Sequence, residues 1–450
     1  MTDTPPNKQP RPLRTKLRSD PVWRRIAKLG IPSLGSVLLS PIYAATDSAM
    51  MGHVGKIPLA ALALAMGFLN FWVLPFTSIG FAITSRAASL TGKGDASARD
   101  NLGMSSAAAM GLLGLGLGTL FAVTAPEVSR LLTHSGPVAR STTEYLRLAA
   151  IGIPALFIYQ AGSMFLTGIG RTGRVLAITA FNVGLNILLE AVLVFWAHMS
   201  VAGSAIGTDA AEIAGAAVII LTLRYRGAFS KLGARVIDFF KEFLPAGAAL
   251  AVRTFALVGA LSGSVFVASQ GTPEVLDSFQ VGQQIWLVFG LSFDAIAVPA
   301  QVLVGEWLAK DQLRSMRHWT SRLLNIGWIG GVGLGIIVVL TRGPLVAVFT
   351  NIPSISGPAR ESVIFAGLAM PVTAVSFVID GLIGGFQHFH LLRTIMLISL
   401  VTTAAFTLVL LAVLDPQLSV IDVWVIFGVW LVVRAFASLV AWKKLLHSHA

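Results

Sequence analysis

Long apolar stretches recur along the whole chain, and they limit its fold more than any other feature. A run of roughly 18 or more apolar residues can cross a hydrocarbon layer of about 30 Å as a helix. Hydropathy predicts twelve such spans, at residues 29–50, 58–85, 103–124, 146–168, 175–197, 201–223, 243–269, 279–306, 323–341, 362–386, 392–413 and 419–441. With 55% hydrophobic and 12% charged residues, the chain has too little polar surface for a water-soluble globule. We therefore expect an all-α integral membrane protein with about twelve transmembrane helices.

Lys and Arg gather in alternate loops, and this bias predicts the orientation, because cytoplasmic loops carry the excess. The basic side includes Arg14, Arg24, Arg25, Lys28, Lys93, Arg99, Arg171, Arg174, Arg224, Arg226, Lys231, Lys310, Arg314, Arg317, Lys443 and Lys444. The opposite loops hold Lys56, Arg130, Arg140, Arg342 and Arg360. Both termini are thus predicted to be cytoplasmic, in a plasma (inner) membrane. The net charge of +12 is explained by this topology and by contact with anionic lipid, so we expect no nucleic-acid partner.

An internal repeat divides the chain into halves. A shift of about 217 residues places Gly114, Gly116 and Gly118 on Gly331, Gly333 and Gly335, Pro154 on Pro371, and Gly168 on Gly385. An even number of spans per half gives both halves the same orientation, related by a pseudo-twofold axis along the membrane normal. We predict a cytoplasmic tail (1–25), a six-helix lobe (26–223), a cytoplasmic connector (224–241) and a second six-helix lobe (242–450). The glycine strings are expected to pack helices closely.

Ionisable side chains inside the spans are the first candidates for function. Each costs about 2.5–3.5 kcal/mol on insertion scales, so it usually faces a cavity or a partner. Such acids are Asp47, Glu190, Asp294 and Asp380. The alternative is that they only satisfy neighbouring polar groups, and for Asp294 and Asp380 the neutralising group would be Arg253.

Other polar residues in the spans receive different predictions. Asn186 and Glu190 are four residues apart and share one helix face. Asp209 and Glu212 are expected to be structural or to lie near the membrane face, and Arg434 is expected to reach toward a helix end.

The string DSAMMGHVG (47–55) resembles the loop after the first span of the multidrug and toxic compound extrusion (MATE) family. The resemblance covers nearly the whole chain. The strings RTFALVGA (253–260), FDAIAVPAQVLVG (293–305), SFVIDGLIGG (376–385) and FNVGLNILLEAVLVF (181–195) look like the DNA-damage-inducible F (DinF) branch. This resemblance implies two six-helix lobes, and it implies cation-coupled efflux of organic, often cationic or amphipathic, compounds.

The resemblance also implies a cation or proton site in the N-terminal lobe. The matching positions are Asp47, Asn186, Glu190 and Thr208. The family more usually has Asp where this chain has Glu190, which adds one methylene. We predict coupling to a proton, or to sodium at the same four oxygen-bearing side chains, since hard cations prefer oxygen ligands. No other metal and no cofactor is expected, and the absence of Cys excludes thiolate metal sites.

A substrate cavity or secondary polar site is predicted from the remaining polar groups, because membrane amides and charges need partners. Its candidates are Gln160, Arg253, Gln280, Gln284, Asp294 and Asp380. The leading hypothesis is an antiporter for small, drug-like molecules, monomeric and in contact with membrane lipids. Arg253 motivates an alternative, a flippase for lipid-linked or anionic amphiphiles. No enzyme is expected, since no Ser/His or His/Glu cluster has catalytic spacing on the spans.

Overall fold

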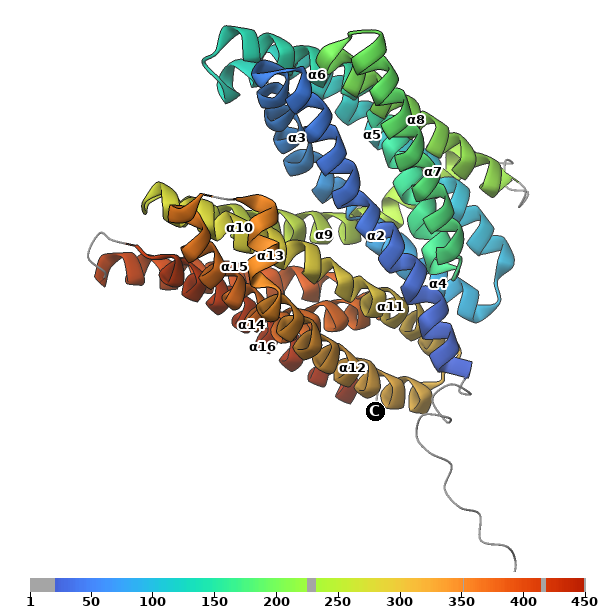
Figure 1. The fold of residues 1–450 in the computed structure, drawn as a ribbon. Coiled ribbons are helices and arrows are strands. Elements are labelled where there is room, and N and C mark those ends of the chain that lie inside the picture. Colours follow the sequence, from blue (N-terminus) through green and yellow to red (C-terminus); the bar gives the residue numbers. More distant parts are fainter. Residues whose placement is uncertain (1–20, 225–231, 351, 414–417, 449–450) are drawn as a thin grey trace, which may run out of the picture.

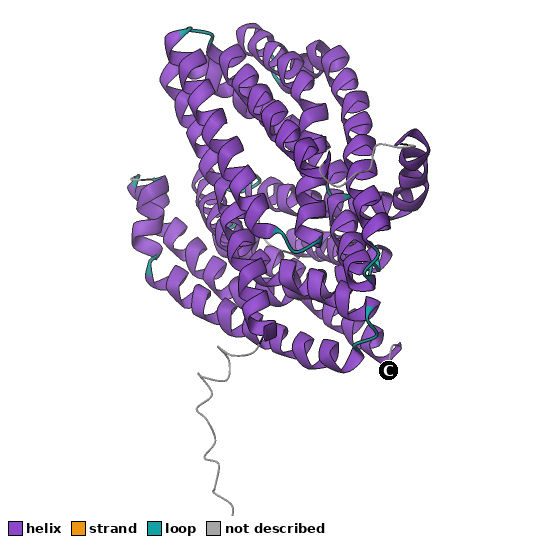
Figure 2. Ribbon diagram, turned by 90° about the vertical axis from the view of Figure 1, so that its right-hand side faces the viewer, coloured by secondary structure: helices purple, strands orange, loops and turns teal. Residues whose placement is uncertain are grey.

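The computed structural model describes residues 21–224, 232–350, 352–413 and 418–448, and the part of the chain it describes is helical with short connections (Figure 2). The N-terminal half contains α2 (Pro21–Val54), α3 (Lys56–Thr77), α4 (Gly80–Lys93), α5 (Ala96–Leu132), α6 (Gly136–Gly168), α7 (Thr172–Ala191), the π-helical η1 (Val192–Trp196) and α8 (Ser200–Arg224). The C-terminal half contains α9 (Leu232–Ala268), α10 (Pro273–Gly290), the 3-10 turn η2 (Leu291–Phe293), α11 (Asp294–Ala309), α12 (Leu313–Leu340), α13 (Arg342–Phe349), α14 (Pro353–Gly385), α15 (Phe389–Val413) and α16 (Val420–Ser448).

Twelve helical segments in the described residues are long and apolar enough to cross a membrane, which confirms the predicted fold class. Their boundaries differ from the predicted spans. Helix α9 starts at Leu232, inside the predicted connector 224–241, while residues 225–231 of that connector lie outside the described residues. Residues 1–20 of the predicted tail 1–25 also lie outside the described residues. Helix α2 begins at Pro21, before the predicted end of the tail.

The second span of each half is broken at an equivalent place. In the first half, α3 ends at Thr77 and α4 begins at Gly80; in the second half, η2 separates α10 from α11. A proline lies close to each break, Pro75 in α3 and Pro299 in α11. Because proline removes one backbone donor and crowds the preceding turn, Pro299 can account for the break before it, whereas the break after α3 follows Pro75 and is not explained by it.

Small residues are buried between the helices and large apolar side chains are exposed, the reverse of the pattern in a water-soluble protein. On α5, Gly111, Gly114 and Gly118 are buried, whereas Leu115 and Val123 are exposed. Such an exposed apolar surface is stable only against lipid.

The glycines of the repeat make the same contact in both halves. A Cβ on Gly114 would lie 2.8 Å from the Cα of Pro154, and one on Gly331 would lie 2.7 Å from the Cα of Pro371. Helices α5 and α6 in one half, and α12 and α14 in the other, therefore pack backbone to backbone at equivalent positions.

The described helices form two bundles, with α2–α8 in blue to green and α9–α16 in yellow-green to red (Figure 1). Polar contacts join them. Gln301 on α11 donates to the Phe81 carbonyl at 2.8 Å and to Ser85 Oγ at 2.7 Å on α4. Ion pairs link Arg25 with Glu306 and Arg86 with Glu242, the second at 2.9 Å. These residues lie toward the helix ends that the charge bias predicts to be cytoplasmic.

Candidate functional site

The four residues predicted to bind a cation come together where α2, α7 and α8 meet. Asn186 Nδ2 donates to Thr208 Oγ1 at 3.0 Å, and the Tyr43 hydroxyl lies 3.2 Å from the same oxygen. Asp47 accepts a hydrogen bond of 2.9 Å from Ser204 and lies close enough to Glu190 for the two acids to interact. Asp47 is 2% exposed and Glu190 is 0% exposed.

Local features of α7 and α8 place Glu190 in this position. Gly207 on α8 lies against the backbone of Glu190, and a Cβ there would be 3.0 Å from the Glu190 nitrogen. The α-helical hydrogen bonding of α7 ends at Ala191, and a π-helical turn follows. Single π turns are frequent at functional sites.

Three buried oxygens at this site accept no hydrogen bond from the described residues. They are Asn186 Oδ1 and both carboxylate oxygens of Glu190. A carboxyl group without exposure is expensive to keep charged unless a proton or a cation compensates it. The oxygen atoms that could bind a cation here come from two carboxyls, an amide and hydroxyls. Such ligands fit a proton or a hard cation such as sodium.

A cavity of about 490 Å³ adjoins this site inside the N-terminal bundle. Its lining includes Asn186 and Thr208 from the predicted set, together with Gln160, which was predicted to line a cavity. The tyrosines Tyr43, Tyr145 and Tyr159 contribute aromatic surface. A volume of this size suits a drug-sized ligand.

Two acids that were expected to be structural or to lie near the membrane face also line the cavity. Asp209 and Glu212 lie in the middle of α8, and Asp209 is buried. Their position in the middle of α8, on the side that looks into the bundle, differs from the membrane-face alternative, and the structural alternative stays a prediction. Glu212 Oε2 is buried and accepts no hydrogen bond from the described residues.

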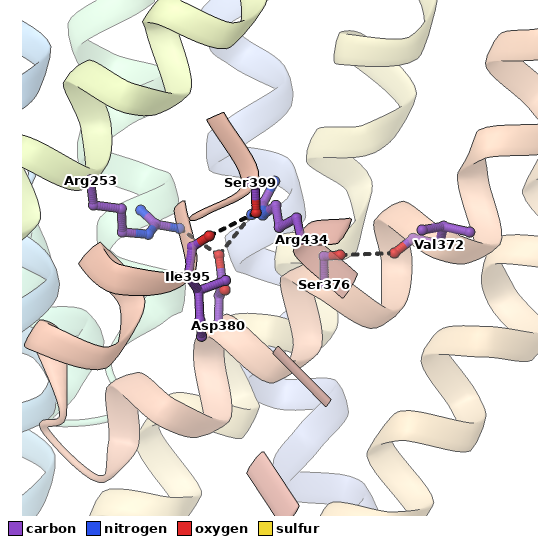
Figure 3. Close-up of polar contacts among 7 residues, drawn as sticks. All are labelled: Arg253, Val372, Ser376, Asp380, Ile395, Ser399 and Arg434. Atoms are coloured by element: carbon purple, nitrogen blue, oxygen red, sulfur yellow. Dashed lines mark hydrogen bonds and ion pairs between the residues drawn. The ribbon is translucent and has the colours of Figure 1, made fainter. Parts of the chain in front are cut away.

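The C-terminal bundle holds a different arrangement, an ion-pair cluster drawn in Figure 3. Arg253 on α9 and Arg434 on α16 both donate to Asp380 Oδ2 on α14, at 2.5 and 2.7 Å. Arg434 is only 2% exposed and lies over the rings of Phe377 and Trp430. The expectation that Arg434 reaches a helix end is wrong, because it pairs with a buried acid in the interior.

The other predicted polar residues of this half are dispersed. Asp294 is half-buried and lies within electrostatic range of Arg253 and Asp380. Gln280 and Gln284 are exposed on α10 and do not line the cavity of the N-terminal bundle. The charge of Arg253 is engaged by Asp380, so it gives the flippase hypothesis no support. Within the described residues, no group of three or more His, Cys, Asp or Glu side chains could hold a metal ion.

Two members of the site were missed by the sequence interpretation, Tyr43 and Ser204. Each lies four residues before a predicted ligand on the same helix face, Tyr43 before Asp47 and Ser204 before Thr208. That spacing could have identified them.

Comparison with known proteins agrees with this architecture. The MatE family model matches the chain twice, over residues 32–192 and 248–409. "Protein DETOXIFICATION 44, chloroplastic" from Arabidopsis thaliana is 24% identical over 97% of this chain and 87% of its own length. "Probable multidrug resistance protein NorM" from Thermotoga maritima is 24% identical over 81% of this chain and 80% of its own length.

Solved structures share the fold. An outward-facing multidrug resistance transporter of the MATE family superposes with a TM-score of 0.85 at 17% identity, covering 96% of this chain and 97% of that one. The bent form of a MATE transporter from Vibrio cholerae gives 0.85 at 14% identity, covering 97% and 99%. The assignment to the DinF branch stays a prediction. With the family matched in both halves and twelve membrane-length helices among the described residues, the chain belongs to the MatE family and is an integral membrane transporter, not an enzyme.

Proposed function

We propose that this transporter is a cation-coupled antiporter, driven by protons or by sodium, that exports amphipathic or organic cationic compounds by alternating access. One observation carries the proposal. The buried acids Asp47 and Glu190 form no ion pair with a described basic residue, and they adjoin a cavity of about 490 Å³. Their charge therefore has to be compensated by something that enters and leaves.

Asp47, Asn186, Glu190 and Thr208 would hold the coupling cation. When bound, a proton or sodium ion supplies the positive charge that the two carboxyls lack. Ser204 orients Asp47 by its hydrogen bond, and Asn186 holds Thr208. The site thus has a loaded and an unloaded state that differ in charge, as a coupling site requires.

Helix α2 is the element that connects this site to the other bundle. It carries Asp47 near one end and Arg25, the partner of Glu306 on α11, near the other. Pro32 and Pro41 lie between them, and proline weakens a helix at the preceding turn. A change of charge at Asp47 can therefore bend α2 and alter the contact between the bundles.

The energetics limit what one coupling charge can do. One charge moving through 100 mV releases about 2.3 kcal/mol. Because about 1.4 kcal/mol corresponds to tenfold, this supports roughly a fifty-fold gradient of a neutral solute. Export of a monocation in exchange for one proton moves no net charge, so it needs a pH gradient or a second coupling ion.

The test is transport of a fluorescent organic cation by purified protein in proteoliposomes, with imposed pH or sodium gradients. Asp47→Asn and Glu190→Gln should each abolish gradient-driven transport while the protein stays in the membrane. Glu127→Gln, at an exposed acid of α5, is the matched control and should transport normally. Wild-type rates in either site variant would refute the proposed coupling site.

A further inference from the structure

We propose that Asp209 and Glu212 form the subsite for the cationic centre of the exported compound, separate from the coupling acids Asp47 and Glu190. The inference rests on the proposed export function and specifies where its cargo binds. If it holds, cargo and coupling ion do not compete for one carboxylate.

The lining of the cavity separates the two acid pairs. Asp209 and Glu212 line it, and they are the only charged side chains of the described residues that do so. Asp47 and Glu190 are not among the lining residues, whereas Asn186 and Thr208 of the coupling site are. A compound inside the cavity therefore meets the acids of α8 and not the coupling acids.

A row of polar residues along α7 and α8, here called the polar ladder, leads from the coupling acids to Glu212. On α7 it consists of Glu190, Asn186 and Asn182; on α8 it consists of Ser204, Thr208 and Glu212, all at intervals of four residues. Ser204 holds Asp47, Asn186 binds Thr208, and Asn182 Nδ2 donates to the Ala211 carbonyl at 2.9 Å. Eight residues of helix separate Ser204 from Glu212, which corresponds to about 12 Å.

The free acceptors in the cavity point to a cation. Glu212 Oε2 is buried and accepts no hydrogen bond from any described residue. Asn186 lines the cavity, is 2% exposed, and its Oδ1 is equally free of described donors. An anion would be repelled by both acids in their charged form, whereas an organic cation would compensate that charge.

Aromatic rings complete a site for an organic cation. Tyr43, Tyr145 and Tyr159 line the same cavity, and aromatic faces attract a desolvated cation. Tyr43 also reaches Thr208 with its hydroxyl. It therefore touches both the cavity and the ladder that leads to the coupling acids. Asn186 and Thr208 likewise belong to both sites, so the sites can influence each other without sharing a carboxylate.

Gly152 on α6 controls the position of Asp209. A Cβ at this glycine would collide with the Asp209 carboxylate. Gly152→Ala therefore displaces Asp209 while keeping every charge of the cavity.

Tetraphenylphosphonium is the probe, because its charge does not change with pH. Its Kd for the purified full-length protein in detergent would be measured by calorimetry, with size-exclusion chromatography as the test of folding. Asp209→Asn combined with Glu212→Gln should weaken binding by about tenfold or more. Asp47→Asn and Glu190→Gln should each change the Kd by less than about threefold, since the probe does not reach these acids.

Three further variants make the result specific. Asp209→Glu should retain most of the binding, whereas Gly152→Ala should weaken it although all charges remain. Glu127→Gln is the control for loss of a remote acid. If the double variant fails to fold, Gly152→Ala and the single variants Asp209→Asn and Glu212→Gln carry the test.

Two results would overturn the inference. One is unchanged probe binding in the α8 variants, and the other is equal loss of binding in Glu190→Gln, which would mean one shared site. Neither result touches the antiport proposal, which fails only if Asp47→Asn and Glu190→Gln keep gradient-driven transport.

Discussion

The two bundles pack in the same way but treat their buried acids differently. In both, a glycine contacts the backbone beside a proline of the neighbouring helix, Gly114 beside Pro154 and Gly331 beside Pro371. In the C-terminal bundle, Asp380 is neutralised by Arg253 and Arg434. In the N-terminal bundle, no described basic residue pairs with Glu190. A repeated scaffold can therefore hold a fixed charge cluster in one half and an exchangeable charge in the other.

The largest difference is expected in stability. Asp380→Leu leaves the buried Arg434 and the half-buried Arg253 without the acid they share, which should cost roughly 3–5 kcal/mol of the free energy of unfolding. Glu190→Gln removes an acid that has no partner to lose, so its cost should be below about 1 kcal/mol. Thermal unfolding in detergent would compare the two, with Asp380→Glu as the conservative control. Equal destabilisation by both variants would contradict the contrast between the bundles.

The next effect concerns the hydroxyls beside the acids. Ser204→Ala removes a hydrogen bond to Asp47, and bonds to charged groups contribute about 1.5–3 kcal/mol. The concentration of coupling ion needed for half-maximal transport should therefore shift by about tenfold or more. Among the described residues, Ser376 bonds only the Val372 carbonyl of its own helix (Figure 3), so Ser376→Ala should leave that concentration unchanged. A similar shift in both variants would show that the effect is not specific to the N-terminal site.

The shared packing is tested by the repeated glycines. Gly114→Leu and Gly331→Leu should destabilise the protein alike, by about 1–3 kcal/mol, because each forces two helix backbones apart. Gly116 and Gly333 lie two residues further along, with open space around them, so leucine there should be nearly neutral. Apparent unfolding temperatures of the four variants would give the comparison. Unequal effects within either repeated pair would show that the bundles do not pack alike.

The smallest effect is expected at the contact between the bundles. Gln301→Leu removes two hydrogen bonds to α4, each contributing about 0.5–1.5 kcal/mol. Since the chain has no native Cys, spin labels at Lys93→Cys and Lys310→Cys can report the distance between α4 and α11. The variant should increase the population with the longer distance. Gln283→Leu is the control, because the hydrogen bond of Gln283 to the Leu261 carbonyl stays within the C-terminal bundle. An unchanged distance distribution in Gln301→Leu would exclude a role of Gln301 in holding the bundles together.

Part of the site follows from local sequence alone. Asn186 and Glu190 share a helix face at any rotation of α7, because an interval of four is nearly one turn. The resemblance to the MATE family predicted Asp47 and Thr208 as further members of the site. Tyr43 and Ser204 could have been predicted from the four-residue spacing to these two residues. Hydropathy likewise predicts the spans, since roughly 20 apolar residues are needed to cross lipid.

Hydropathy was sufficient to predict the twelve spans, and the internal repeat identified glycines at which helices touch. Which charged groups meet became clear only from the packing of the helices. Asp380 pairs with arginines 127 and 54 residues away in sequence, and Asp209 and Glu212 face a cavity instead of the membrane surface. The physical reason is that helix rotation and crossing are set by packing against neighbouring helices, whereas hydropathy reports only that a segment lies in the membrane.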